Sequence, residues 1–255
     1  MHLGLEKKVV LVTGGTKGIG RAIVAGFLLE GATVHFCSRT EKDITAANTK
    51  LASDFPSAKA HGSVVDVSKL DDLNAWVESC AKESGQIDVV VPNVSCFAMK
   101  NTREDWQACF HTDMLALWSI IQTSLPYLEK TKGNVVTISS VTGRDVDFTA
   151  PSPYGAMKAA VVHYTAQLAH TMAGKGVRAN CVSPGNIYIE DGVWGDIERN
   201  LPDLFKSQMA LNPMGRMGKA EEIADAVVFL ASQRASFVSG TNTVVDGSLC
   251  TGVQL

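Results

Sequence analysis

The chain has 255 residues, of which 45% are hydrophobic and 19% are charged, and its formal net charge is −3. This length suits a single α/β domain with a full core. The slight negative charge offers no basic field, so we expect no nucleic acid partner. No stretch approaches the ~20 apolar residues of a membrane span, and the first residues lack the apolar core of a signal peptide. We therefore expect a cytoplasmic protein with no membrane partner.

The six cysteines and six histidines are scattered along the sequence. The cysteines include no Cys-x-x-Cys pair, and the histidines show no ligand spacing. We expect reduced, mainly structural cysteines and no bound metal.

Apolar, β-branched runs alternate along the chain with stretches of helical periodicity. Strands are predicted within residues 8–13, 32–38, 61–68, 88–95, 133–140, 177–185 and 241–247. Asp66 and Ser68 are predicted to follow the third strand, and the fourth strand is predicted to open into a loop at Pro92. Helices are predicted at residues 21–31, 43–53, 69–84, 102–130, 154–174 and 220–232. The alternation predicts one α/β domain over residues 1–255, with a doubly wound, seven-stranded parallel sheet of the Rossmann type. Residues 186–215 show no long clean period, and we interpret them as a substrate-binding lid with one or two short helices.

The first predicted strand ends in a glycine-rich turn that leads into a helix. Glycines let the backbone turn tightly and approach a pyrophosphate, whose charge then lies at the positive end of the helix. The strand before and the helix after are the context that this interpretation requires, and a purely structural turn is the alternative. The predicted cofactor-binding residues of this turn are Gly14, Thr16, Lys17, Gly18, Ile19 and Gly20.

The second predicted strand ends in Ser38 and Arg39, where dinucleotide-binding folds select their cofactor. An acidic residue there accepts hydrogen bonds from the ribose of NAD, whereas a basic residue accommodates the 2′-phosphate of NADP. No acid stands at this turn, and Arg39 with Lys17 could clamp the phosphate. We therefore predict a preference for NADP(H) over NAD(H), with two solvated surface cations as the alternative.

Tyr154 and Lys158 stand four residues apart in a helical pattern, so one helix face presents a phenol beside an ammonium. A phenol titrates near ~10, but a nearby cation favours the phenolate and makes proton transfer easier at neutral pH. Ser140 ends the fifth predicted strand and could bond the same substrate oxygen. Taken alone, the pair is also compatible with a surface tyrosine one turn from a solvated lysine.

The candidate residues follow predicted strands, so they are expected on one rim of the sheet. This holds for Gly14, Arg39, Asp66, Asn93, Ser140 and Pro184. Their convergence strengthens the interpretation more than any single motif does.

The motifs, in this order and at these spacings, resemble those of the short-chain dehydrogenase/reductase family over essentially the whole chain. The resemblance rests on Thr13-Gly14-x-x-x-Gly18-Ile19-Gly20, Asp66-Val67, Ser140, Tyr154-x-x-x-Lys158, Pro184-Gly185, and residues 215–232 and 239–247. It implies a Rossmann fold, usually homotetrameric, that transfers hydride between nicotinamide C4 and a carbonyl or alcohol carbon.

The resemblance also assigns roles by position. Tyr154 is the expected acid/base, Ser140 polarises the substrate oxygen, and Lys158 supports the phenolate and holds the nicotinamide ribose. Asp66 and Val67 are expected against the adenine, and Pro184, Gly185 and Ile187 against the nicotinamide. Asn93 is counted among the cofactor-binding residues.

The sequence departs from the family pattern at three places. Pro92-Asn93-Val94-Ser95 replaces the family's Asn-Asn-Ala-Gly, and Ile189 replaces a threonine that is expected to contact the carboxamide. Asp113 aligns with the helix asparagine of the family's proton relay. We hypothesise that Asp113 keeps the relay through its main-chain carbonyl while its carboxylate favours the charged form of Lys158.

We therefore predict an NADPH-dependent reductase of carbonyl compounds that also works as an alcohol dehydrogenase. A 3-oxoacyl thioester reductase is an alternative, and a catalytically impaired NADP(H)-binding sensor or oligomeric partner is another. In the lid, Glu190, Asp191, Asp196, Glu198 and Asp203 outnumber Arg199 and Lys206, which disfavours an acidic carrier protein. Candidate pocket residues, which ordinary packing would also explain, are Phe97, Phe148, Tyr188, Trp194 and Met209. A homotetramer is expected by family analogy.

Overall fold

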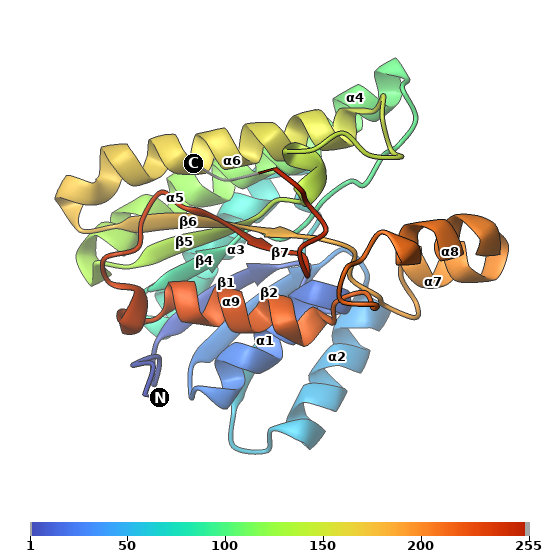
Figure 1. The fold of residues 1–255 in the computed structure, drawn as a ribbon. Coiled ribbons are helices and arrows are strands. Elements are labelled where there is room, and N and C mark those ends of the chain that lie inside the picture. The colour runs from blue at the N-terminus through green and yellow to red at the C-terminus, as the bar shows by residue number, and fades with distance from the viewer. Residues whose placement is uncertain (1, 253–255) are drawn as a thin grey trace.

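Seven parallel strands, most of them buried, form the centre of the structure (Figure 1). The computed structural model describes residues 2–252. The strands are β1 (Val9–Thr13), β2 (Thr33–Ser38), β3 (Lys59–Val64), β4 (Val89–Val91), β5 (Asn134–Ile138), β6 (Arg178–Pro184) and β7 (Asn242–Val245). Their order in the sheet is β3-β2-β1-β4-β5-β6-β7, which confirms the predicted doubly wound fold. The order reverses between β1 and β4, and this switch point is where such sheets bind ligands.

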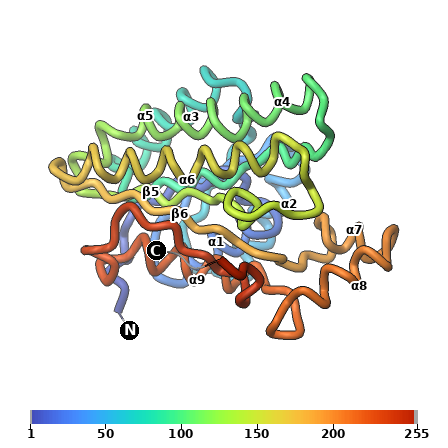
Figure 2. Tube along the Cα trace, turned by 45° about the horizontal axis from the view of Figure 1, so that its top comes forward, coloured from blue at the N-terminus to red at the C-terminus, as the bar shows by residue number. Residues whose placement is uncertain are grey.

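Helices cover both faces of the sheet (Figure 2). The α-helices are α1 (Gly18–Leu29), α2 (Glu41–Asp54), α3 (Leu70–Ser84), α4 (Arg103–Cys109), α5 (Ala116–Thr131), α6 (Pro153–Met172), α7 (Val193–Asn200), α8 (Pro202–Ala210) and α9 (Ala220–Ala231). A π-helical segment η1 (Phe110–Leu115) joins α4 to α5, and single 3₁₀ turns form η2 (Val141–Gly143), η3 (Ala173–Lys175) and η4 (Gln233–Ala235).

Two apolar cores lie on opposite faces of the sheet. Helices α1, α2 and α9 pack on one face, whereas α3, α5 and α6 pack on the other. Alternate residues of β1 divide between them, because side chains along a strand point to opposite faces. Val10 and Val12 join the first core, and Leu11 joins the second.

The structure corrects two of the predicted boundaries. The helix predicted at 102–130 is interrupted by the π-helical segment 110–115. The third strand begins at Lys59 rather than at residue 61 and ends at Val64, and the Asp66 carboxylate accepts from the Ser68 N–H at 3.1 Å in the turn that follows. The fourth strand ends at Val91, and the chain opens into a loop at Pro92 as predicted, because Pro92 has no N–H to donate to the sheet.

Helices α7 and α8 extend away from the rest of the molecule, beyond the ends of the strands (Figures 1 and 2). They fall within residues 186–215, where the sequence predicts the lid. Among the helices of residues 2–252, none is both long and apolar enough to cross a membrane.

Candidate active site

The loops after β1 and β4 are joined at the switch point. The Asn93 N–H donates to Oγ1 of Thr13 at 3.0 Å. The Asn93 side-chain amide donates to the carbonyl oxygen of Thr13 at 3.0 Å and to that of Gly14 at 3.5 Å. Asn93 therefore holds Thr13 and Gly14, the first residues of the glycine turn, in place through these hydrogen bonds.

The glycine turn is shaped by close backbone contacts. Gly14 and Gly18 have positive φ angles of 70° and 54°, which favour glycine. A Cβ atom on Gly20 would lie 2.1 Å from the carbonyl oxygen of Gly14, so no larger residue fits there. Among the described residues, no side chain caps the start of α1 and no acid lies in its first turn. The backbone N–H groups in the first turn of α1 are therefore left without a side-chain acceptor among the described residues. They lie at the positive end of the helix, where they fit the pyrophosphate of a dinucleotide.

The two cations predicted to clamp a 2′-phosphate lie in different settings. The Lys17 ammonium pairs with Asp43 of α2 at 3.0 Å. Arg39 is exposed after β2, which ends at the half-buried Ser38. Partial burial raises the pKa of Asp66, but hydrogen bonds from Ser68 and the Arg39 charge outweigh it and lower the pKa overall. Arg39 thus lies near Asp66. The 2′-phosphate of a bound NADP would have to compete with the Asp43 carboxylate for the Lys17 ammonium.

Tyr154 and Lys158 lie in the first two turns of α6. Tyr154 is half-buried, whereas Lys158 is only 3% exposed. The Lys158 ammonium lies 5.7 Å from the centre of the Tyr154 ring and donates to the carbonyl oxygen of Ile138 at 3.2 Å. A buried lysine is incompatible with the alternative of a solvated surface pair.

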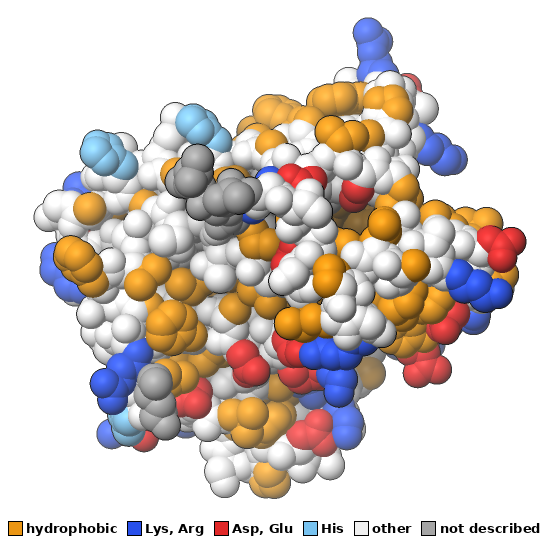
Figure 3. All heavy atoms as spheres, viewed as in Figure 1, with side chains coloured by type: hydrophobic (Ala, Val, Ile, Leu, Met, Phe, Trp, Pro, Cys, Tyr) orange, Lys and Arg blue, Asp and Glu red, His pale blue; other side chains and the backbone are white. Residues whose placement is uncertain are grey.

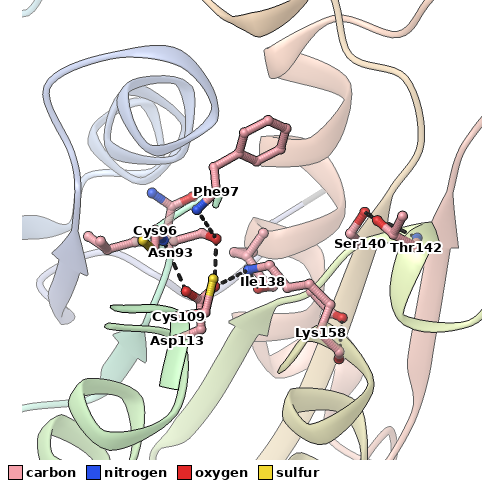
Figure 4. Close-up of polar contacts among 12 residues, drawn as sticks. Asn93, Cys96, Phe97, Cys109, Asp113, Ile138, Ser140, Thr142 and Lys158 are labelled. Atoms are coloured by element: carbon pink, nitrogen blue, oxygen red, sulfur yellow. Dashed lines mark hydrogen bonds and ion pairs between the residues drawn. The ribbon is translucent and has the colours of Figure 1, made fainter. Parts of the chain in front are cut away.

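Ser140 stands at the end of β5, next to the start of α6. It is the N-cap of η2, and its hydroxyl lies 2.5 Å from the Thr142 hydroxyl (Figure 4). The Ser139 hydroxyl donates to the carbonyl oxygen of Lys158 at 2.7 Å. A Cβ atom on Gly143 would lie 2.6 Å from the carbonyl carbon of Lys158. This close packing brings the Ser140 turn against the helix that carries Tyr154 and Lys158.

Asp113 contacts Lys158 directly through its side chain (Figure 4). One carboxylate oxygen lies 3.3 Å from the Lys158 ammonium, and both side chains are at least 96% buried. The Ser95 hydroxyl donates to the same oxygen at 2.5 Å, and the Cys96 N–H donates to the other at 2.9 Å. Ser95 was not among the predicted site residues; the available signal was a hydroxyl at the position where the family pattern has glycine.

Phe97 packs against Tyr154. Its backbone has a φ of 52°, which a non-glycine residue adopts at a cost of about 1–3 kcal/mol. Its N–H donates to the Ser95 hydroxyl at 3.3 Å, and its ring centre lies 4.7 Å from that of Tyr154 in an edge-on arrangement. The contacts of Ser95 with Asp113 therefore also hold Phe97 beside the reactive phenol.

The other predicted pocket residues divide into two groups. The rings of Phe148 and Trp194 contact each other in a tilted arrangement with their centres 5.7 Å apart, which links the loop before α6 to α7. Tyr188 contacts other residues of the predicted lid. Its hydroxyl donates to Glu198 at 2.5 Å, and its ring centre lies 6.1 Å from that of Phe205. Met209 is half-buried on α8. Figure 3 shows hydrophobic side chains on both the α7–α8 arm and the nearby ends of α4 and α6.

The loop after β6 comes close to the glycine turn. Pro184 ends β6, and Ile187, which is 7% exposed, pairs with Gly218 in an isolated bridge. A Cβ atom on Gly18 would lie 2.9 Å from Cδ1 of Ile189, so these loops meet across the rim. After β3, Val67 is 5% exposed and its side chain belongs to the second core.

Comparisons with known proteins cover nearly the whole chain. A family model described as "Enoyl-(Acyl carrier protein) reductase" matches residues 14–249. Isoepoxydon dehydrogenase of Penicillium expansum is 38% identical, and the alignment covers 98% of each chain. A 3-oxoacyl-(acyl-carrier-protein) reductase of Thermotoga maritima is 33% identical, over 96% of this chain and 98% of the relative.

A solved structure has the same fold. It is L-sorbose reductase from Gluconobacter frateurii, complexed with NADPH and L-sorbose, and it superposes with a TM-score of 0.90 at 26% identity. The match covers 99% of this chain and 100% of the other. On the combined evidence of fold, motifs and relatives, this chain is an oxidoreductase that belongs to the short-chain dehydrogenase/reductase family.

Proposed function

We propose that the protein is an NADP(H)-dependent oxidoreductase that interconverts a ketone and a secondary alcohol. The observation that carries the proposal is the buried Lys158 ammonium, 5.7 Å from the Tyr154 ring, next to the Ser140 turn. A buried cation beside a phenol is the arrangement that proton transfer to a carbonyl oxygen requires. The relatives support an oxidoreductase, and one solved relative is a reductase complexed with NADPH.

Three side chains of the protein, those of Ser140, Tyr154 and Lys158, carry out the proton transfer. The glycine turn and Lys158 would hold NADPH, which would supply the hydride for the carbonyl carbon when bound. Ser140 donates a hydrogen bond to the carbonyl oxygen, and Tyr154 gives that oxygen its proton. Lys158 stabilises the resulting phenolate, which regains a proton from solvent. In the direction of alcohol oxidation, the phenolate accepts the proton instead.

Asp113 is assigned the role of keeping Lys158 charged. A buried ammonium without a partner tends to lose its proton, whereas a carboxylate 3.3 Å away favours the charged form. The Asp113 carboxylate is in turn satisfied by Ser95 and Cys96. Asp113, which replaces the family's asparagine, therefore gives Lys158 a charged partner.

The lid favours a small ketone over a 3-oxoacyl group on an acidic carrier protein. Arg199 is paired with Asp196 at 2.5 Å and also donates to the carbonyl oxygen of Glu190, so it adds little free positive charge. An acidic carrier would meet a negatively charged arm. The aromatic side chains of Phe97, Phe148 and Trp194 fit an apolar or cyclic substrate of moderate size. The sensor alternative is disfavoured by the intact set of Ser140, Tyr154 and Lys158.

Replacing Tyr154 by Phe tests the reaction. The variant should lower the rate of NADPH oxidation with a panel of ketones by roughly 10²-fold or more, because the proton donor is lost. NADPH affinity, followed by fluorescence titration, should stay close to that of the wild type. Tyr164→Phe on the same helix, whose hydroxyl lies 3.2 Å from Gln122, is the matched control and should keep full activity. Retained turnover in Tyr154→Phe would overturn the proposed mechanism.

Replacing Arg39 by Asp tests the cofactor preference. The Kd for NADPH should rise by roughly 10- to 100-fold, since a charge-assisted bond to the 2′-phosphate is lost, while the Kd for NADH should change little. Lys59→Asp makes the same charge change at the other end of the strands, where β3 begins beside β2, and should leave both constants unchanged. An equal loss for the two cofactors would show that Arg39 does not contact the 2′-phosphate.

Replacing Asp113 by Asn tests the electrostatic role of the carboxylate. The pH–rate profile should shift, because the buried Lys158 ammonium would lose the carboxylate that pairs with it at 3.3 Å. Ser95→Ala removes one hydrogen bond to Asp113 but leaves the charge, so its profile should keep the wild-type position. An unmoved profile in Asp113→Asn is the result that contradicts the role.

We also propose a cytoplasmic homotetramer. Trp106, Phe110 and Trp118 on α4, η1 and α5 are 40–47% exposed, and Phe237 after η4 is fully exposed, so two separate apolar faces are available for partner copies. Light scattering should give four times the mass of one chain. Trp118→Glu should shift the protein to smaller species, and a monomeric wild type would refute the tetramer.

A further inference from the structure

We propose that residues 247–252, here called the C-terminal strap, position the catalytic Ser140 turn by holding Arg144. The strap follows β7 and runs back toward α6 (Figure 1). This inference rests on the proposed function, because the turnover that it affects is the one assigned to Ser140 and Tyr154. Arg144 is a positioning residue in this proposal, since it acts through Ser140.

The strap begins at a fixed point. The Asp246 carboxylate accepts from the Ser248 N–H at 2.9 Å and from the Cys250 N–H at 2.8 Å. Gly247 and Ser248 have φ angles of 64° and 66°, so the chain reverses sharply there. Asp246 therefore sets the direction in which the strap leaves β7.

The same point is packed against the loop that follows β6. A Cβ atom on Gly185 would lie 2.6 Å from Cβ of Asp246, and the Gly185 N–H donates to the carbonyl oxygen of Val245 at 3.0 Å. Gly185 belongs to the loop expected against the nicotinamide. The base of the strap is thus tied to the cofactor side of the rim.

The far end of the strap is held by Arg144. The Arg144 guanidinium donates to the carbonyl oxygen of Gly252. Its Nε also lies 3.5 Å from a carboxylate oxygen of Asp145. The Arg144 side chain is 19% exposed, and its hydrogen bond to Gly252 lies at the protein surface.

Arg144 is one short turn from Ser140. Ser140 is the N-cap of the 3₁₀ turn η2 and Arg144 is its C-cap, and the Arg144 N–H donates to the carbonyl oxygen of Val141 at 2.9 Å. A displacement of Arg144 is therefore passed through a single turn to the Ser140 hydroxyl.

The middle of the strap lies near the same turn. The Cys250 thiol is close to the carboxylates of Asp145 and Asp246, and burial, followed by these two carboxylates, raises the pKa of Cys250 to about 12. The hydrogen bond from Arg144 to Gly252 is the contact that attaches the strap to the Ser140 turn.

The expected consequence is a loss in kcat with little change in cofactor binding. Small displacements of a catalytic group reduce the rate strongly, because the hydrogen bond to the reacting oxygen depends on its position. The pyrophosphate region of the glycine turn lies on β1 and α1 and makes no use of the strap contacts described above.

The experiment is a double-mutant cycle in which each variant is compared with the unaltered protein. The three variants are Arg144→Gln, a chain that ends at Cys250, and the combination of both. Each single variant should lower kcat by about 10- to 100-fold with an unchanged Kd for NADPH, and the combination should fall no further. Arg234→Gln is the matched control, because Arg234 donates at 3.0 Å to the carbonyl oxygen of His2 at the other terminus, and it should keep wild-type kcat.

Two outcomes overturn the proposal: wild-type kcat in Arg144→Gln, or losses that multiply in the combined variant. Hydrogen–deuterium exchange of residues 139–146 gives a readout that needs no substrate. It should become faster in both single variants and stay at the wild-type rate in Arg234→Gln. If the wild type reduces no carbonyl compound, the proposed function fails while this exchange measurement still decides the role of the strap.

Discussion

The buried ammonium of Lys158 is the constraint on which the candidate site depends. A charge removed from water destabilises the fold unless it is paired and hydrogen-bonded. Here the ammonium is satisfied by the Asp113 carboxylate and the Ile138 carbonyl, and the carboxylate by Ser95 and Cys96. These groups come from the loop after β4, from η1, from β5 and from α6. One charge therefore ties four separate segments together at the rim where the strands end.

Two of the departures from the family pattern, Asp113 and the loop after β4, can be explained together. Asp113 in place of asparagine brings a second charge into the interior, which would be costly if its lone pairs were unmet. The altered loop after β4 supplies the Ser95 hydroxyl and the Cys96 N–H that meet them. The π-helical segment that carries Asp113 is the kind of irregular turn that often occurs at functional sites. A change at one of these positions alone would leave a buried polar group without a partner.

The sequence was sufficient for the sheet and for the rim, because apolar runs and the glycine, proline and hydroxyl residues after them are local signals. It could not show the π-helical interruption of the predicted helix at 102–130, since one extra residue in a turn barely disturbs an apolar period. The contact of Ser95 with Asp113 and the pairing of Lys17 with Asp43 depend on distances in space. The link of Arg144 to Gly252 joins residues 108 positions apart, for which no local pattern exists.

The hydrogen bonds around Lys158 and Asp113 also hold the backbone of Phe97. A left-handed backbone at a bulky residue costs about 1–3 kcal/mol and persists only where neighbouring contacts determine it. Ser95 supplies that determination, because its hydroxyl accepts from the Phe97 N–H while donating to Asp113. The result is a phenol with a cation 5.7 Å from its ring centre and an aromatic edge against the same ring. The interactions that satisfy the buried charge thus also hold the Phe97 ring against Tyr154, so one network sets both the pairing of the charge and the packing around the phenol.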